Sequence, residues 1–151
     1  MDLYIARHGE AGIAAYDDLR ELTANGIATT RTIYTQNAAS IHQSIATVIC
    51  SPLVRARQTA EIALNVLPVR SSNLMVSETL RPESSPGVIA SFLDSQAEWP
   101  ILLVGHQPVL GELLAWLTDQ EHFRAGIATS SLYALNLITP AQGCGTVLWQ
   151  S

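Results

Sequence analysis

The chain has 151 residues, 48% of them hydrophobic and 14% charged, and its net charge is −5 at pH 7. This length suits a single globular domain over residues 1–151, and the low charged fraction excludes a disordered chain. The acidic balance argues against nucleic-acid binding, and no apolar run is long enough to cross a bilayer or to act as a leader. We therefore expect a cytoplasmic protein without membrane contact.

The cationic residues narrow the chemistry further, because all eight are arginine and there is no lysine. This excludes a Schiff-base lysine and a Walker-type phosphate loop, both of which need a lysine amine. An anion site must then be built from arginine, histidine and backbone N–H groups. The two cysteines, Cys50 and Cys144, lack the spacing of metal ligands and are expected to be reduced thiols.

The first third of the chain alternates strand and helix patterns. Residues 2–6 (DLYIA) predict a strand that ends in the polar turn Arg7-His8-Gly9-Glu10, and residues 11–22 predict a loop. Thr23 is a suitable N-cap for a helix that runs to about residue 40. Residues 46–50 (ATVIC) predict a second, buried strand.

The next helix is expected to begin at Ser51-Pro52, because serine caps free N–H groups and proline fits the first helical position. Pro68 ends its apolar stripe. The remaining elements are expected, in chain order, as a strand at 74–77, a helix at 87–96, a strand at 101–105, a helix from Val109, and strands at 131–138 and 145–149. This alternation predicts a three-layer α/β/α domain around a mostly parallel, mixed sheet.

Polar clusters follow three of the predicted strands. Arg7 and His8 follow the first strand, Arg55 lies early in the helix after the second, and His106 follows the strand at 101–105. Ligands of open α/β sheets bind outside the carboxyl ends of the strands, so these side chains are expected to converge. Two arginines, two histidines and a helix N-terminus suit a tetrahedral dianion such as phosphate.

A neutral imidazole among arginines can attack phosphorus. Neighbouring positive charges lower the pKa of a histidine, and the same charges neutralise the oxygens of the phosphoryl group. The transfer can then proceed through a phosphohistidine, which water hydrolyses, and no metal or other cofactor is needed. The sequence thus predicts metal-free phosphoryl transfer.

Four ordered motifs resemble those of the histidine phosphatase superfamily, which has the phosphoglycerate mutase-like fold. They are Arg7-His8-Gly9-Glu10, Leu22-Thr23-Ala24-Asn25-Gly26, the run from Ser51 to Ala60, and Val104-Gly105-His106-Gln107-Pro108. The resemblance implies that His8 is the nucleophile and that Arg7, Arg55 and His106 hold the phosphoryl oxygens. The short bacterial SixA-type branch, whose members are phosphohistidine phosphatases, is similar in length and in the Leu80-Arg81-Pro82 turn.

Other residues are candidates for supporting roles. Gly9, Arg20 and Ser131 are expected to contribute to substrate binding, although Arg20 could equally pair with Asp17 or Glu21. The candidate proton donors are Glu10, Glu78 and Glu83.

The spacing of the motifs bears on the substrate. Related mutases and sugar-phosphate phosphatases usually insert helices over the pocket between the third and fourth of these motifs. Here Arg55 and His106 are only 51 residues apart (106 − 55), which leaves little chain for a lid. A small metabolite needs enclosure, so an open site favours a phosphohistidine on a protein surface, as in a phosphotransfer domain.

Three alternatives remain open at this stage. The protein could act on small phosphate esters as a phosphatase or mutase, or it could be a silent domain that only binds phosphorylated partners. A metal hydrolase is disfavoured because few carboxylates accompany the histidines, and activity in excess chelator would exclude it.

Overall fold

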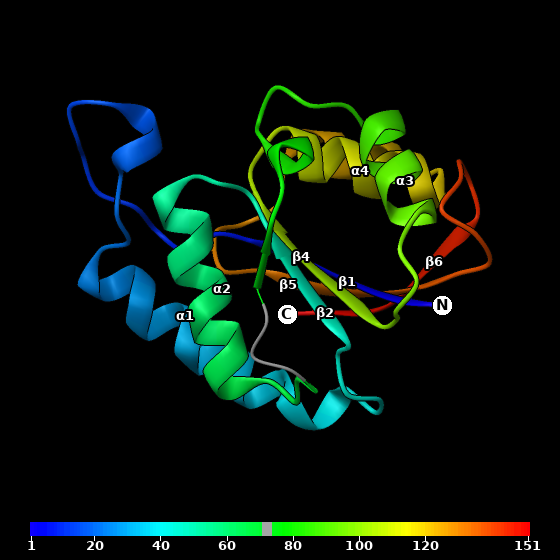
Figure 1. Cartoon of the computed structure of the whole chain (residues 1–151), viewed down its shortest axis with the longest axis horizontal. Coiled ribbons are helices and arrows are strands. Elements are labelled where there is room, and N and C mark those ends of the chain that lie inside the picture. The colour runs from blue at the N-terminus through cyan, green and yellow to red at the C-terminus, as the bar shows by residue number, and fades with distance from the viewer. Residues whose placement is uncertain (71–73) are drawn as a thin grey trace.

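The computed structural model describes residues 1–70 and 74–151 and contains a six-stranded sheet of order β3-β2-β4-β1-β5-β6 (Figure 1). Its strands are β1 (Asp2–Arg7), β2 (Thr47–Cys50), β3 (Leu74–Val76), β4 (Ile101–Gly105), β5 (Leu132–Leu137) and β6 (Gly145–Gln150). The first four strands run parallel. At one edge β5 pairs antiparallel with β1, and β6 pairs antiparallel with β5. The predicted mostly parallel, mixed sheet is confirmed.

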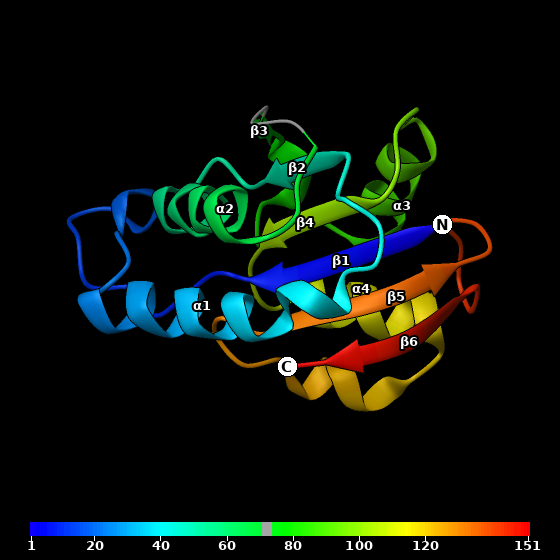
Figure 2. The same cartoon turned by 90° about the horizontal axis from the view of Figure 1, so that it is seen from below.

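Helices cover both faces of the sheet. They are α1 (Ala24–Asn37), α2 (Val54–Val66), α3 (Pro86–Asp94) and α4 (Val109–Thr118). Helices α1 and α2 lie side by side on one face, and α3 and α4 lie on the other (Figure 2). The predicted three-layer α/β/α architecture is therefore confirmed.

Strand β1 shows how the sequence divides the core in two. Leu3 and Ile5 pack toward α3 and α4, while Tyr4 and Ala6 pack toward α1 and α2. Successive side chains of a strand point to opposite faces, so a strand covered on both sides must be apolar at every position. Strand β4, with all five residues buried, follows the same rule.

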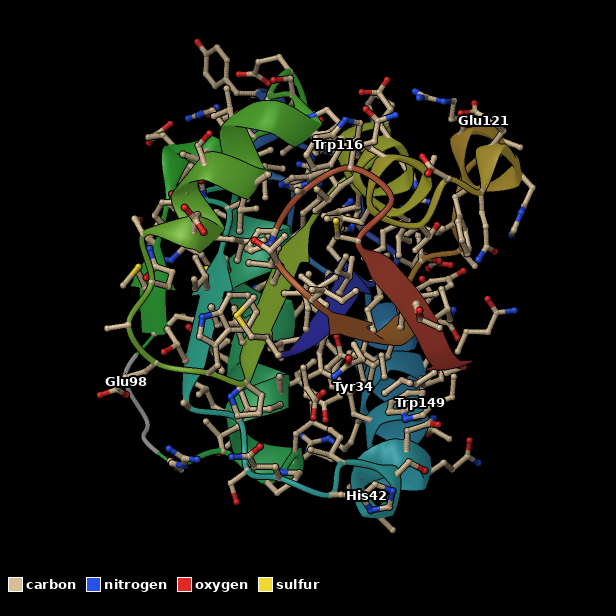
Figure 3. The ribbon with its side chains drawn as sticks, turned by 90° about the vertical axis from the view of Figure 1, so that its right-hand side faces the viewer. Tyr34, His42, Glu98, Trp116, Glu121 and Trp149 are labelled. Atoms are coloured by element: carbon tan, nitrogen blue, oxygen red, sulfur yellow. The ribbon has the colours of Figure 1, made fainter. Side chains whose placement is uncertain are left out.

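Two tryptophans extend these cores. Trp149 of β6 packs on the cluster under α1 and α2, with its ring 6.2 Å from that of Tyr4, and Trp116 of α4 packs on the opposite cluster (Figure 3). Both side chains thus contribute to the packing of the core.

No helix in the described ranges has the length and apolar character needed to cross a membrane.

The predicted start of α2 at Ser51-Pro52 is wrong by two residues. The helix begins at Val54, with Leu53 as its extended N-cap residue, and Arg55 is the second helical residue. The Ser51 hydroxyl accepts only a long, 3.4 Å bond from the Leu53 N–H, so it closes a local turn ahead of the helix. A Ser-Pro pair fits such a turn as well as a helix start, which the local sequence alone does not distinguish.

The segment between β1 and α1 is more ordered than the predicted loop. Ala11 and Leu22 form a β-bridge, the Gly12 N–H donates to the Glu21 carbonyl over 2.8 Å, and Asp17–Leu19 form a short 3-10 turn, η1. The base of this loop is therefore fixed. At Gly26 of α1, any side chain would collide with the Glu10 backbone, so glycine lets the two segments pass in contact.

Candidate active site

The site lies where three parallel strands end. The His8 N–H donates to the Gly105 carbonyl at the end of β4 (3.0 Å), and the Ser51 N–H after β2 donates to the Val104 carbonyl (3.0 Å). These bonds bring the residues that follow β1, β2 and β4 to one edge of the sheet. The predicted convergence of His8, Arg55 and His106 rests on this register.

The ring of His8 is held in one tautomer by its two partners. Its Nδ1 lies 2.7 Å from the Gly9 carbonyl oxygen, and its Nε2 lies 3.2 Å from Nε of Arg55. A carbonyl can only accept and a guanidinium can only donate, so Nδ1 carries the proton and Nε2 presents its lone pair. The nitrogen that faces Arg55 is thus the one with nucleophilic character.

Arg55 is buried, with 4% of its surface exposed, and uses each of its three nitrogens. Besides the bond to His8, Nη1 donates to the Asp17 carbonyl (2.8 Å) and Nη2 to the Asp17 carboxylate (3.0 Å). Arg20 pairs with the other carboxylate oxygen of Asp17 (3.1 Å). These bonds lower the pKa of the Asp17 carboxyl, chiefly through Arg55, and orient the guanidinium beside His8.

Arg7 and His106 supply buried nitrogens without protein partners. Nη1 of Arg7 donates to the Ile127 carbonyl (2.6 Å), but its Nε and both ring nitrogens of His106 have no hydrogen-bond partner among the residues that the structure describes. The ring of His106 lies 5.0 Å from that of His8. Buried polar atoms are rarely left unpaired, so the Nε–H of Arg7 and the single N–H of the neutral His106 ring are suited to the oxygens of a bound anion.

The two imidazoles resist protonation. Burial lowers the pKa of His8 to about 4, with the charges of Arg55 and Arg7 acting in the same direction and the Gly9 carbonyl opposing them. Burial also lowers the pKa of His106 to about 3, followed by repulsion from His8 and Arg55. Both rings are therefore neutral at pH 7, as a nucleophile and a hydrogen-bonding ligand require.

These shifts predict that acid destabilises the fold before the carboxylates titrate. An unfolded chain protonates both rings near the ordinary pKa of about 6.5, whereas the folded protein does not, so the unfolded state binds more protons below pH 7. We expect the free energy of unfolding to fall by about 2 kcal/mol per histidine between pH 7 and pH 5. Urea unfolding measures this, and His106→Gln should show about half the decrease. A variant with an unchanged decrease would contradict this assignment.

Three residues predicted to bind substrate are placed beside the site, with their polar groups engaged. The Gly9 N–H donates to Thr59 Oγ1 (3.1 Å), and Nε of Arg20 donates to the Gly12 carbonyl (2.7 Å). The Ser131 hydroxyl donates to the Ala128 carbonyl (2.6 Å). Their contribution to substrate binding stays a prediction, and the contacts observed here are ones that hold the site together.

The three candidate proton donors lie on the surface. The Glu10 carboxylate accepts hydrogen bonds from Thr23 (2.6 Å) and Asn25 (3.2 Å) at the start of α1. Glu78 pairs with Arg81, and Glu83 is exposed on the following turn. None of these contacts reaches His8, so the donor role also stays a prediction.

Two residues that contribute to the site are not among the predicted ones. Asp17 lies in a segment predicted only as a loop, yet it anchors Arg55 across 38 positions of sequence. Thr59 lies within the third motif, Ser51 to Ala60, where its hydroxyl links the Gly9 N–H to the Arg55 carbonyl (2.8 Å). Its position one turn after Arg55 on the same helix is a usable clue.

In the described ranges, no group of three or more His, Cys, Asp or Glu side chains is arranged to hold a metal.

A family model for the histidine phosphatase superfamily (branch 1) matches residues 3–81, which include the first three of the four motifs. The chain belongs to this superfamily, as the sequence predicted, and this supports a phosphatase enzyme. It is 31% identical over 154 aligned positions to the phosphohistidine phosphatase SixA of Escherichia coli, an alignment that covers 99% of this chain and 92% of that protein.

Solved structures agree with this assignment. The structure of the protein histidine phosphatase SixA complexed with tungstate has a TM-score of 0.87 and 30% identity, and the match covers 99% of this chain and 96% of that one. A phosphoglycerate mutase from Plasmodium falciparum has a TM-score of 0.71 at 14% identity, with 98% of this chain and 88% of that one covered. The second match shows the fold alone, and it confirms the predicted phosphoglycerate mutase-like architecture.

Proposed function

We propose that this protein hydrolyses phosphohistidine on a partner protein, through a phosphohistidine intermediate on His8. The observation that carries the proposal is the geometry of the His8 ring, whose unprotonated Nε2 lies against Arg55 while Nδ1–H is bound by Gly9. The similarity to SixA, a phosphohistidine phosphatase, supports this substrate class. The tungstate bound in the SixA structure is a tetrahedral oxyanion, as a phosphoryl group is.

In the first step, Nε2 of His8 would attack the phosphorus, and the bond between phosphorus and the substrate imidazole would break. The Nε–H of Arg7, the N–H of His106 and the two N–H groups of Arg55 that His8 and Asp17 do not use would hold the phosphoryl oxygens. The phosphorylated His8 ring, still protonated at Nδ1, carries a positive charge. The Gly9 carbonyl, 2.7 Å from Nδ1, is placed to stabilise that charge.

In the second step, water would attack the phosphorus and release phosphate. The His8 ring then departs as a neutral imidazole, because the proton on Nδ1 is already in place. The substrate imidazole of the first step can likewise leave neutral once its free ring nitrogen is protonated. An alkoxide departing from a phosphate ester needs a stronger proton donor. The carboxyl group of Asp17, which is bonded to Arg55, has a lowered pKa and is a poor donor, and none of the contacts of Glu10, Glu78 and Glu83 reaches His8. This favours phosphohistidine over phosphate esters.

Substrate comparison tests this choice. Purified protein should have a higher kcat/KM for a phosphorylated histidine phosphotransfer domain than for a phosphoserine peptide or a sugar phosphate. The physical reason is the smaller demand for a proton donor when imidazole leaves. Faster turnover of the phosphoserine peptide or the sugar phosphate would overturn the proposal in favour of a phosphate-ester enzyme.

The biological setting is part of the same proposal. Phosphotransfer domains that carry phosphohistidine belong to histidine kinase relays, so the protein would act in two-component signalling as an off-switch. A cytoplasmic location and the absence of a metal or other cofactor stay predictions from the sequence. Activity that persists in excess chelator would support the latter.

A further inference from the structure

The loop of residues 12–20 exposes large apolar side chains next to the site. Ile13 is fully exposed, Tyr16 is 73% exposed and Leu19 is 55% exposed, all within seven positions of sequence. The loop lies beyond the carboxyl end of β1, beside the N-terminus of α2 (Figure 1). Through Asp17 it is bonded directly to Arg55.

This loop is held in place at three points. Arg20 closes it on itself by donating to the carbonyls of Gly12 (2.7 Å) and Ala11 (3.4 Å). Asp17 ties it to Arg55, and Asp18 ties it to Arg81 over 3.1 Å. A loop with this many anchors presents its side chains in a fixed arrangement, which lowers the entropy lost when another surface binds to them.

The pairing of the acids defines the chemistry that the loop presents. Asp17 is paired with Arg55 and Arg20, and Asp18 with Arg81, so the carboxylates at the centre of the loop are neutralised within the protein. The large apolar groups that the loop presents to another molecule are the side chains of Ile13, Tyr16 and Leu19. Their exposure shows that they face solvent, whereas residues that enclose a small metabolite would face the imidazoles.

We infer that the 12–20 loop is the docking surface for the protein substrate, and that it packs on an apolar patch beside the substrate phosphohistidine. This inference rests on the proposed function and extends it from the phosphoryl group to the protein that carries it. The loop borders the site through Asp17, so a partner whose phosphohistidine reaches His8 also covers the loop.

The test compares a folded substrate with a free one. The triple variant Ile13→Ser/Tyr16→Ser/Leu19→Ser removes the apolar contacts and leaves Asp17, Asp18 and Arg20 unchanged. With a phosphorylated histidine phosphotransfer domain, its kcat/KM should fall about 10- to 100-fold below that of the wild type. With the amino acid phosphohistidine, both proteins should have the same kcat/KM. Because these side chains are exposed, thermal unfolding should be unchanged.

Ile138→Ser is the matched control. Ile138 is 84% exposed and directly follows β5, which runs antiparallel to β1, so it lies at the opposite end of the sheet from His8. It should change neither activity.

Each other outcome separates the two proposals. If the wild type shows no preference for the folded domain over free phosphohistidine, or if the triple variant keeps that preference, the docking inference is wrong while the phosphatase proposal stands. If the wild type hydrolyses neither substrate, the proposed function itself fails. Sedimentation velocity tests whether a second copy of this chain covers the loop instead. If the wild type is a dimer and the triple variant is a monomer, the loop serves self-association and the inference is overturned.

Discussion

His8→Ala should abolish turnover of a phosphorylated phosphotransfer domain, with a loss in kcat of about 10⁴-fold or more. The substitution removes Nε2, the only group that the proposal places in line to form a bond with phosphorus. The remaining cationic side chains would still bind the anion, so inorganic phosphate should continue to compete with substrate for the variant. Steady-state kinetics and phosphate binding by calorimetry measure these two effects separately.

The same variant tests the intermediate. Wild-type protein mixed with phosphorylated domain and quenched rapidly at neutral or alkaline pH should gain the mass of one phosphoryl group, and His8→Ala should not. His42→Ala is a suitable control, since His42 is exposed and follows α1 and η2 (Ala38–Ser40), ahead of the start of β2, whereas the site lies beyond the end of that strand (Figure 3 shows His42). A phosphorylated His8→Ala protein would show that another residue is the nucleophile.

Arg55→Met should lower kcat/KM by about 10³-fold. The loss has two sources, since the guanidinium is placed both to hold a phosphoryl oxygen and to orient Nε2 of His8 through a 3.2 Å bond. The positive charge of Arg55 also helps to keep the pKa of His8 low, so the variant should show a higher pKa for this ring. NMR titration of the His8 ring protons measures that change directly.

Two further variants separate charge from geometry at this position. Arg55→Lys keeps the charge but lacks the planar fork that bonds His8 and Asp17 together, and we expect it to lose about 10²-fold in kcat/KM. Arg57→Met removes an equal charge two residues further along α2, on the exposed side, and should be nearly silent. A lysine variant with full activity would show that charge alone suffices and that the oriented fork does not matter.

Much of the fold was readable from local patterns. The strand at 101–105 is apolar at every position and bounded by Pro100 and His106, and its predicted limits are those of β4. The alternation of strands with helices implied crossover connections and hence parallel strands whose carboxyl ends share one edge. From that geometry alone, residues after β1, β2 and β4 could be expected to meet, and the structure does bring His8, Arg55 and His106 together.

The sequence by itself thus determined the layered architecture and the set of residues at the carboxyl edge of the sheet, because periodicity and turn chemistry are local properties. The resemblance of its four motifs indicated the superfamily. Only the tertiary structure decided which nitrogen of His8 is unprotonated. That depends on the Gly9 carbonyl accepting a hydrogen bond from one ring nitrogen while Arg55 donates to the other. The tertiary structure also placed Asp17 on Arg55 and left Ile13 in solvent. A hydrogen bond across 38 positions, or the exposure of one apolar side chain in a loop, is set by how distant segments pack, and no local pattern contains that information.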